Sequence, residues 1–362
     1  MKKFIAILLI LIVIFSNISN AVEVDDEVNN KVEVEVDVNV QDEEENDEII
    51  ISLVGDTCFD GALKKHIGKY GISYPWDKVS SYFKEDDLTV VNLETSATTG
   101  GKKWPDKQYN FRSNPNSIKG MAEAGVEVAT LANNHVLDYG YSGLLDTLKY
   151  LDKYNIKYTG AGKNKKEAIE GVIVEVKGAK IGIVSFSRVI PDMKWYATNK
   201  RPGLVSGYDY YVGEMTKKIA EMKKKSDIVI LSIHWGVERS TTPRKQEINV
   251  AKKAIESGAD IVMGHHPHVL QGIQVYKGKP IFYSLGNFIF NSGSEAGTNT
   301  MIGQVCIVDK KIQSINVIPC KIVNGRPVPL EGKKKAGAIN NINKLSKPFG
   351  FRVNGRGIME IK

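Results

Sequence analysis

Five short clusters of polar residues mark this sequence, because each follows a run of apolar residues. The chain of 362 residues contains six histidines, and five of them fall in these clusters. The sixth, His66, lies in a Lys-rich stretch and is expected at the surface. The clusters are Gly55-Asp56, Asn92-Leu93-Glu94, Asn133-Asn134-His135, His234-Trp235-Gly236 and Gly264-His265-His266-Pro267-His268. Together they offer the Asp, Glu, Asn and His side chains that borderline divalent metals accept as ligands.

The chemistry that such a set would support is metal-assisted hydrolysis. An imidazole offers a neutral nitrogen lone pair, a carboxylate can bridge two cations, and an Asn carbonyl adds a neutral oxygen. Two cations about 3.5–4 Å apart can activate water and stabilise the oxyanion that forms during hydrolysis. His266 and His268, with Pro267 between them, predict a tight loop that directs both imidazoles toward one centre.

Each cluster alone also has an ordinary structural explanation. An Asp that follows a Gly at a strand end is often a turn or N-cap residue. Two Asn residues before a His often cap a loop, and His234 beside Trp235 could be a buried histidine satisfied by backbone groups. Five such clusters at equivalent strand ends favour a metal or phosphate-type site.

The elements that must position these clusters alternate between strands and helices from Ile49 onward. Apolar runs predict strands at 49–54, 88–93, 126–131, 227–233 and 259–263, and two strands within 172–186. Helical spacing predicts helices at 117–124, 141–154, 215–225 and 246–256. Further antiparallel strands are expected at 280–283, 303–308 and 312–318. This order predicts an α/β sandwich with largely parallel pairing, in which ligands bind outside the carboxyl ends of the strands.

The first 48 residues differ in composition from the rest of the chain. Lys2 and Lys3 precede an uncharged apolar run at 4–15, which has the length of a signal-peptide core and is short for a membrane span. Ser19-Asn20-Ala21 offers a cleavage site, so residues 1–21 are expected to be a signal peptide or, alternatively, an N-terminal membrane anchor. Residues 22–48 contain 13 Asp and Glu against one Lys, which predicts a disordered acidic linker.

Charge and cysteine content limit the classes of protein to which this chain can belong. The whole chain has a net charge of +7; residues 22–48 carry −12, so the rest of the chain without the two leader lysines carries +17. A domain with this charge would attract polyanions; the alternative is that its lysines are dispersed over a solvated surface. Three cysteines without a C-x-x-C pair argue against a disulfide scaffold or a zinc ribbon, and Cys306 and Cys320 are expected out of register. No P-loop, G-x-S-x-G or Rossmann motif is present.

Two basic positions are candidates for binding an anionic substrate. Arg112, in the pair Phe111-Arg112, is one, and Arg239 is the other. Both could equally form ordinary surface salt bridges. We also include Asn133, which belongs to one of the polar clusters, and Glu238, which lies two residues after another, in the expected substrate-binding set.

Residues 49–290 resemble the CapA family of poly-γ-glutamate capsule biosynthesis proteins. That family looks like a branch of the calcineurin-like metallophosphoesterases, which implies a four-layer αββα sandwich with a dinuclear metal centre. The matching stretches are GDTCFDG at 55–61, NLETSAT at 92–98, FRSNP at 111–115, LANNHVLDYG at 131–140, HWGVE at 234–238, GADIVMGHHPHVLQ at 258–271 and YSLGNFIF at 283–290.

The resemblance implies a role for each motif residue. Asp56 and His268 would bind the first cation, Glu94 would bridge, and Asn134, His234 and His266 would bind the second. His135 would be the general acid, and His265 lies outside the ligand set. The chain departs from the phosphoesterase pattern at Cys58, where a histidine is usual, and at Asn92-Leu93-Glu94, which replaces Gly-Asp-x-x-Asp. Arg239 stands where the family more often has an aromatic residue.

These features lead to an expected function with two alternatives. The chain is expected to be exported, extracellular or anchored to the outer face of the cytoplasmic membrane, and to act in making, exporting or attaching an anionic polymer such as poly-γ-glutamate. One or two divalent cations (Mn, Fe, Zn or Mg) and a capsule synthase membrane complex are the implied cofactors and partners, and no nucleic acid is expected. A non-catalytic polymer-binding component and a secreted metallophosphatase are the alternatives. The expected domain covers 49–332, and 333–362 is expected to be its peripheral C-terminal tail.

Overall fold

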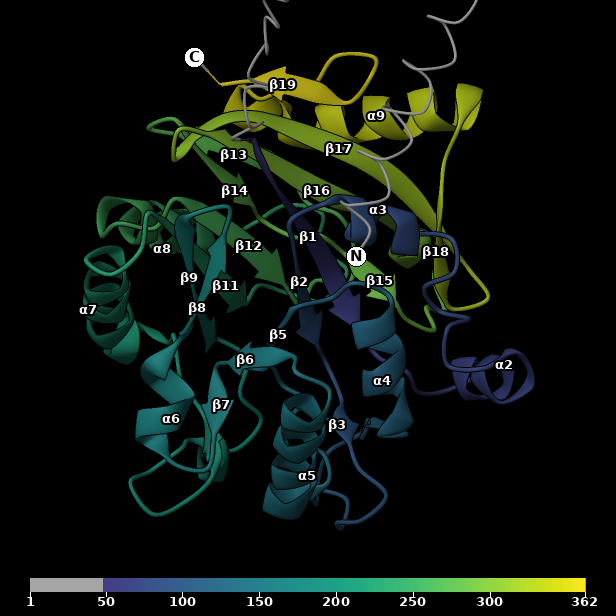
Figure 1. Cartoon of the computed structure of the whole chain (residues 1–362), viewed down its shortest axis with the longest axis vertical. Coiled ribbons are helices and arrows are strands. Elements are labelled where there is room, and N and C mark those ends of the chain that lie inside the picture. The colour runs from purple at the N-terminus through teal and green to yellow at the C-terminus, as the bar shows by residue number, and fades with distance from the viewer. Residues whose placement is uncertain (1–47, 362) are drawn as a thin grey trace, which may run out of the picture. The chain divides into compact units, whose positions relative to one another are not determined.

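The protein is described by a computed structural model that places residues 48–361. The expected leader and nearly all of the expected acidic linker lie outside these residues. The placed region contains two large mixed β-sheets and the helices that cover them (Figure 1). The predicted α/β class is confirmed. Among residues 48–361 there is no helix of the length and apolar character needed to cross a membrane.

The first sheet has nine strands and places the N-terminal strand in its middle. Its order is β18-β17-β16-β1-β2-β5-β6, with β15 beside β1 and β19 beside β17. Strands β1, β2, β5 and β6 are parallel, whereas β16 runs antiparallel to β1. The bounds are β1 Ile49–Thr57, β2 Leu88–Leu93, β5 Val128–Thr130, β6 Lys157–Thr159, β15 Asn287–Ile289, β16 Asn299–Val308, β17 Lys311–Val323, β18 Arg326–Pro329 and β19 Ile358–Glu360.

The second sheet has six strands in the order β13-β14-β12-β11-β9-β8. Strands β9, β11, β12 and β14 are parallel to one another. Strand β14, which the sequence predicted as antiparallel, pairs antiparallel with β13 on one side and parallel with β12 on the other. Two small two-stranded sheets, β3–β4 and β7–β10, complete the strands. The bounds are β3 Ser96–Ala97, β4 Arg112–Ser113, β7 Ala161–Gly162, β8 Val172–Val176, β9 Ala179–Ser187, β10 Gly203–Leu204, β11 Ile228–His234, β12 Ile261–His265, β13 Ile273–Tyr276 and β14 Lys279–Phe282.

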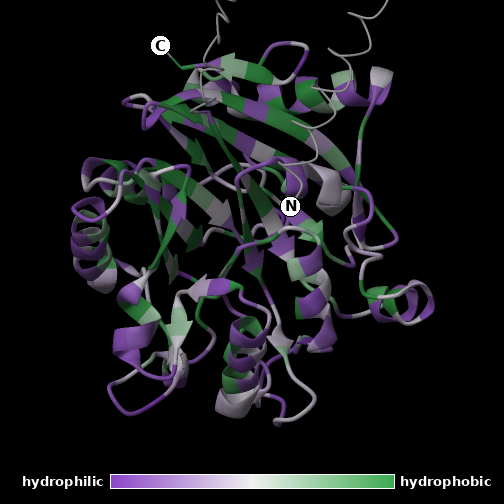
Figure 2. Ribbon diagram, in the orientation of Figure 1, coloured by the Kyte–Doolittle hydropathy of each residue, from purple (hydrophilic) through white to green (hydrophobic). Residues whose placement is uncertain are grey.

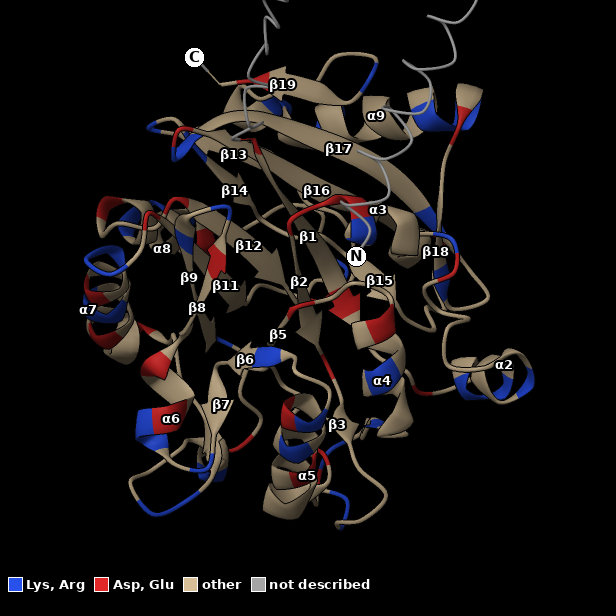
Figure 3. Cartoon of the chain, in the orientation of Figure 1, with Lys and Arg blue, Asp and Glu red and all other residues tan. Residues whose placement is uncertain are grey.

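The four helices that the sequence predicted are present as α4, α5, α7 and α8, within a few residues of their predicted ends. Lys and Arg are spread over the helices, with Asp and Glu among them (Figure 3). The helix bounds are α2 Leu63–Tyr70, α3 Ser80–Glu85, α4 Asn116–Glu123, α5 Gly140–Lys153, α6 Lys165–Glu170, α7 Val212–Lys223, α8 Lys245–Glu256 and α9 Gly332–Ser346, with 3₁₀ turns at η1 Met193–Trp195, η2 Asp209–Tyr211, η3 Ala296–Thr298 and η4 Lys347–Phe349.

The central strands are mostly apolar because both of their faces are buried. In β1, Leu53 belongs to a hydrophobic cluster that both sheets share, whereas its neighbour Val54 packs in a second cluster with helices α4 and α5. In β11, Ile230 joins the shared cluster and Leu231 joins a third one with α7 and α8. Successive side chains of a strand point to opposite faces, so a strand that is covered on both sides needs apolar residues at every position. Figure 2 shows these runs along the central strands.

The C-terminal segment is part of this core, contrary to the expected peripheral tail. Helix α9 contributes Ile339 and Ile342 to the cluster that the two sheets share, and Phe351 and Val353 join them. Strand β19 extends the first sheet by pairing with β17. The segment's many lysines and glycines hid the few apolar residues that anchor it.

A partly buried carboxylate lies at the amino-terminal end of the parallel strands. Glu127 precedes β5, and its Oε2 accepts a hydrogen bond from the backbone N–H of Thr89 at 2.8 Å. Burial raises the pKa of Glu127 to about 7, and the nearby Asp86 adds to the shift. Because the folded protein binds this proton more tightly than the unfolded chain does, Glu127 lowers the stability as pH rises from about 4.5 toward 7.

Replacing Glu127 by Gln is therefore expected to stabilise the protein above pH 7 and to change little near pH 4.5. We expect a gain of about 1 kcal/mol at pH 8 after allowance for solvent screening, or about 2 °C in melting temperature. Thermal melts at both pH values measure it. Glu123→Gln on the exposed surface of α4 is the control and should change neither melt. A Glu127→Gln protein that is less stable than the wild type at pH 8 would contradict the expectation.

Candidate metal centre

The polar clusters of the two sheets converge on one site. Asp56 lies near the end of β1, Glu94 follows β2, and Asn134 and His135 follow β5. The second sheet supplies His234 at the end of β11 and the loop after β12 with His266 and His268. The parallel strands of each sheet end at the same edge, which is where ligands bind in α/β folds (Figure 1).

Two glycines allow the backbones to approach closely beside these clusters. A Cβ at Gly55 would lie 2.1 Å from the carbonyl oxygen of Gly286, and one at Gly264 would lie 2.1 Å from that of Tyr283. Only glycine therefore fits immediately before Asp56 and His265. His266 and His268 adopt positive φ angles of 96° and 56°, a backbone conformation that side-chain-bearing residues rarely take outside functional sites.

The ligand atoms form two groups that share Glu94. In one group, donor atoms of Asp56, Glu94 and His234 all lie within 4.8 Å of one another. In the other group, Glu94, His266 and His268 meet the same limit. Asn134 joins through its Oδ1, which lies 2.8 Å from His234 Nε2. These groups place His266 with His268, whereas the resemblance implied a shared cation for His266 and His234.

The Glu94 carboxylate is the most unusual group in the site. It is fully buried, and neither of its oxygens has a hydrogen-bond partner among the described residues. Burial, followed by repulsion from the Asp56 carboxylate, raises the pKa of Glu94 well above its ordinary value. His266 Nδ1 is likewise buried without a partner. Buried polar atoms almost always have partners, so these residues fit a bound cation that would serve as the missing one.

Asp56 is held as an anion by the histidines around it. Its burial opposes ionisation, but His265 and His268 outweigh burial and hold the pKa of Asp56 well below its ordinary value. His265 Nδ1 lies 3.1 Å from Asp56 Oδ1, and His268 Nδ1 lies 3.2 Å from Oδ2. His265 is thus a neighbour of Asp56, and it is outside both ligand groups.

His135 faces the centre, and Asp138, Lys107 and Phe111 hold its imidazole in place. Its Nε2 lies 4.0 Å from Glu94 Oε1, and its Nδ1 lies 2.6 Å from Asp138 Oδ2. The Phe111 ring stacks on the imidazole with a centroid distance of 4.2 Å. Lys107 Nζ forms an ion pair with Asp138 and lies 2.9 Å from His135 Nδ1. Burial lowers the pKa of His135, although Asp138 opposes this shift.

Sequence reasoning missed four residues that hold the predicted ligands in place. Lys107 and Asp138 fix His135, and the Asn92 side chain donates to Asp56 Oδ1 at 2.9 Å. Asn287 Oδ1 lies 2.8 Å from His268 Nδ1. Asp138 could have been found, since it follows His135 by three residues within a motif already noted. Nothing in the sequence near Lys107 signals its role.

The expected substrate-binding residues separate into three locations. Glu238 and Arg239 line a cavity of about 400 Å³ together with His135 and His268. Asn133 is fully buried and supports the site instead: its amide donates to Asn92 Oδ1 and to the Leu93 carbonyl, and its Oδ1 accepts from the His135 N–H. Arg112 lines a different cavity.

Comparison with known proteins gives one family and several relatives. The model of the family described as "Bacterial capsule synthesis protein PGA_cap" matches residues 50–292. The chain is 33% identical to the capsule biosynthesis protein CapA of Bacillus anthracis, over 79% of this chain and 70% of that protein. It is 32% identical to the PGA biosynthesis protein CapA of Bacillus subtilis (strain 168), over 84% and 80%. A probable polyglutamine synthesis accessory protein of Mycobacterium tuberculosis is 27% identical, over 77% and 78%.

Replacing Glu94 by Gln tests the cation. The wild-type chain equilibrated with Mn²⁺ and desalted should retain metal, and Glu94→Gln should retain at least tenfold less, because one shared ligand is neutralised. Without metal, Glu94→Gln should melt no lower than the wild type, since the buried carboxyl has no hydrogen-bond partner and the nearest histidine nitrogen, His234 Nε2, lies 3.5 Å from it.

Elemental analysis and thermal melts with and without EDTA measure both effects. His66→Gln, which changes a histidine outside the clusters, is the control and should retain metal. Equal Mn²⁺ retention by Glu94→Gln and the wild type would show that this carboxylate holds no cation.

Proposed function

Because the chain belongs to the bacterial capsule synthesis protein family PGA_cap, we propose that it acts in the biosynthesis, export or attachment of poly-γ-glutamate, through a metal-dependent hydrolase-type site. The names of its Bacillus relatives support the polymer. The single observation that supports the site is the buried Glu94 carboxylate, which lacks a hydrogen-bond donor and lies between two groups of metal-ligand atoms.

The residues that would hold the cations come from both sheets. Asp56, His234 and Asn134 would hold one, His266 and His268 would hold the other, and Glu94 would serve both. Bound divalent cations would polarise the bond to be cleaved and stabilise the negative charge that develops on it. The hydrogen bond from Asn92 to Asp56 and the contact of Asn287 with His268 keep these ligands oriented.

His135 is placed to deliver a proton to the leaving group. Asp138 and Lys107 hold its Nδ1 side, so Nε2 faces Glu94 and the cavity that Glu238 and Arg239 line. Phe111 covers one face of the imidazole and limits access of water to it. General acid catalysis by a histidine in this position typically contributes about 10²–10⁴-fold to a rate.

The same proposal includes the finer fold class and the location of the protein. The hydrophobic clusters on both sides of each sheet support a four-layer αββα sandwich of the metallophosphoesterase type. The basic leader with its apolar run supports export, with the mature protein extracellular or anchored to the outer face of the cytoplasmic membrane.

One observation favours a second candidate, a non-catalytic polymer-binding component of a capsule assembly complex. Cys58 stands where the phosphoesterase pattern has a histidine, and the buried Cys58 is absent from both groups of ligand atoms. In this case the inherited site would grip the polymer without cleaving it.

Replacing His135 by Ala separates the two candidates. If the site is hydrolytic, the variant should keep its Mn²⁺ and lose at least 100-fold in turnover of poly-γ-glutamate or of phosphodiesters, and cells that carry it should lose capsule. His66→Gln should behave as the wild type. Unchanged capsule with His135→Ala would support the binding component, and a wild type that retains no metal and turns over neither substrate would refute the enzyme.

A further inference from the structure

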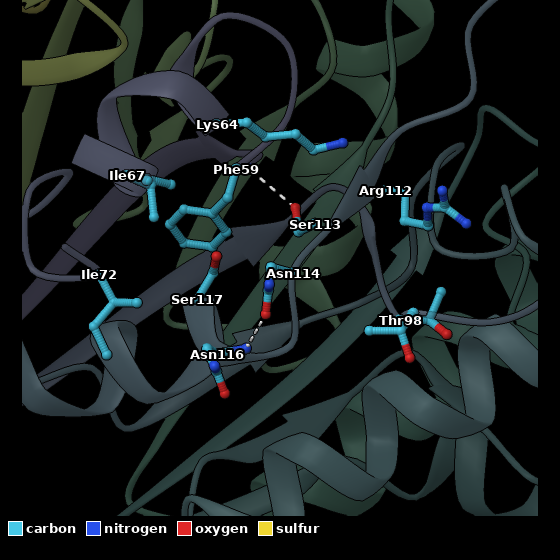
Figure 4. Close-up of a pocket in the computed structure, with 12 residues that line it drawn as sticks. Phe59, Lys64, Ile67, Ile72, Thr98, Arg112, Ser113, Asn114, Asn116 and Ser117 are labelled. Carbon is cyan, nitrogen blue, oxygen red and sulfur yellow. Dashed lines mark hydrogen bonds between the residues drawn. The ribbon is translucent and has the colours of Figure 1, made fainter. Parts of the chain in front are cut away.

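A second cavity is lined in part by Arg112 and Ser113 of strand β4. It has a volume of about 490 Å³, within the ordinary range for ligand sites, and its walls come from α2, the β3–β4 region and the start of α4 (Figure 4). Phe111 stacks on His135, whereas the next residue, Arg112, lines this second cavity. Phe111 and Arg112, which are adjacent in the chain, thus line two separate cavities.

Two hydrogen bonds join strand β4 to the segments that follow Asp56 and Glu94. Ser113 Oγ accepts from the backbone N–H of Phe59 at 3.1 Å and donates to Thr95 Oγ1 at 3.0 Å. Phe59 is three residues from Asp56, and Thr95 directly follows Glu94. The cavity is therefore adjacent to the candidate metal centre through the chain segments that carry two of its carboxylates.

Arg112 brings an uncompensated positive charge to this cavity. Its guanidinium stacks over the Tyr139 ring at 4.6 Å, and within residues 48–361 it forms no hydrogen bond or ion pair. An Arg held in one orientation by an aromatic face, with its five N–H donors free, is suited to a planar anion such as a carboxylate.

The carboxylate that the Arg112 backbone contacts is already satisfied. Asp60 forms an ion pair with Lys64 at 2.6 Å and accepts hydrogen bonds from the backbone N–H groups of Arg112 and Gly61. These contacts hold the pKa of Asp60 below its ordinary value, although burial opposes this. The pair of Lys64 and Asp60 is neutral, so the charge of Arg112 remains for a ligand.

The rest of the lining suits a chain that alternates methylene groups with polar groups. Phe59, Ile67 and Ile72 form an apolar side, Thr98 lies on the opposite side with Arg112, and Asn114 and Asn116 lie between them (Figure 4). A purely ionic ligand would make no use of the apolar side.

From these observations we infer that this cavity is a binding subsite for an acidic polyamide chain, with Arg112 paired to one of its carboxylates. The inference rests on the proposed function, which supplies a polymer of this chemistry. It adds that the polymer binds beside the candidate metal centre, at residues separate from the candidate metal ligands.

Two substitutions in the full-length chain test the subsite. Arg112→Gln removes the charge, and Asn116→Asp adds an opposing charge at the first residue of α4, where an acidic side chain favours the helix. Each should weaken binding of a ten-residue γ-glutamate oligomer about tenfold in titration calorimetry at low salt, and should leave Mn²⁺ retention unchanged. Lys119→Gln on α4, outside the cavity, makes the same charge change as Arg112→Gln and should bind as the wild type.

The outcomes separate this inference from the proposed function. Wild-type binding of the oligomer that neither Arg112→Gln nor Asn116→Asp weakens would overturn the subsite and leave the proposed function standing. Arg112-dependent binding of tripolyphosphate, without binding of the oligomer, would overturn the assignment to a carboxylate chain. A Mn²⁺-loaded wild type that binds no oligomer would overturn the proposed polymer and the subsite with it.

Discussion

The burial of the Glu94 carboxyl group is the constraint on which the candidate site depends. Two carboxylates, Asp56 and Glu94, lie fully buried within one ring of histidines, and only Asp56 has hydrogen-bond donors of its own. An uncompensated buried carboxylate costs several kcal/mol, so a fold retains one only where something offsets that cost. The strand ends, the close glycine contacts and the left-handed histidine loop all hold opposite charge and ligand atoms around this carboxylate.

The residues of the candidate metal centre come from both sheets. The first sheet supplies the two carboxylates, Asn134 and His135, and the second supplies the remaining imidazoles. Because the sheets share one hydrophobic cluster, the distance between the two sets of ligands is fixed by core packing. A centre assembled in this way is rigid, which suits ligands that must keep their positions within a fraction of an ångström.

The sequence was informative where a rule is local. Apolar runs located the central strands, and the polar residues after each run located side chains that converge on one site, because parallel strands end at one edge. The site residues that the sequence did not predict were missed for a physical reason. The direction of a loop side chain depends on tertiary packing, so Asn133 turned inward, Arg112 turned away from the centre, and Lys107 reached it from a segment without a pattern. Helix α9 was missed as core because a few isoleucines among lysines suffice to anchor it.

The position of β1 in the middle of the first sheet has a consequence for biogenesis. Ile49 pairs with Ile307, so the strand that ends in Asp56 has one of its neighbours in the last quarter of the chain. A sheet with such long-range pairing closes slowly and only once almost the entire polypeptide has been synthesised. The chain thus stays open until β16 is available, and the candidate metal centre is assembled only then.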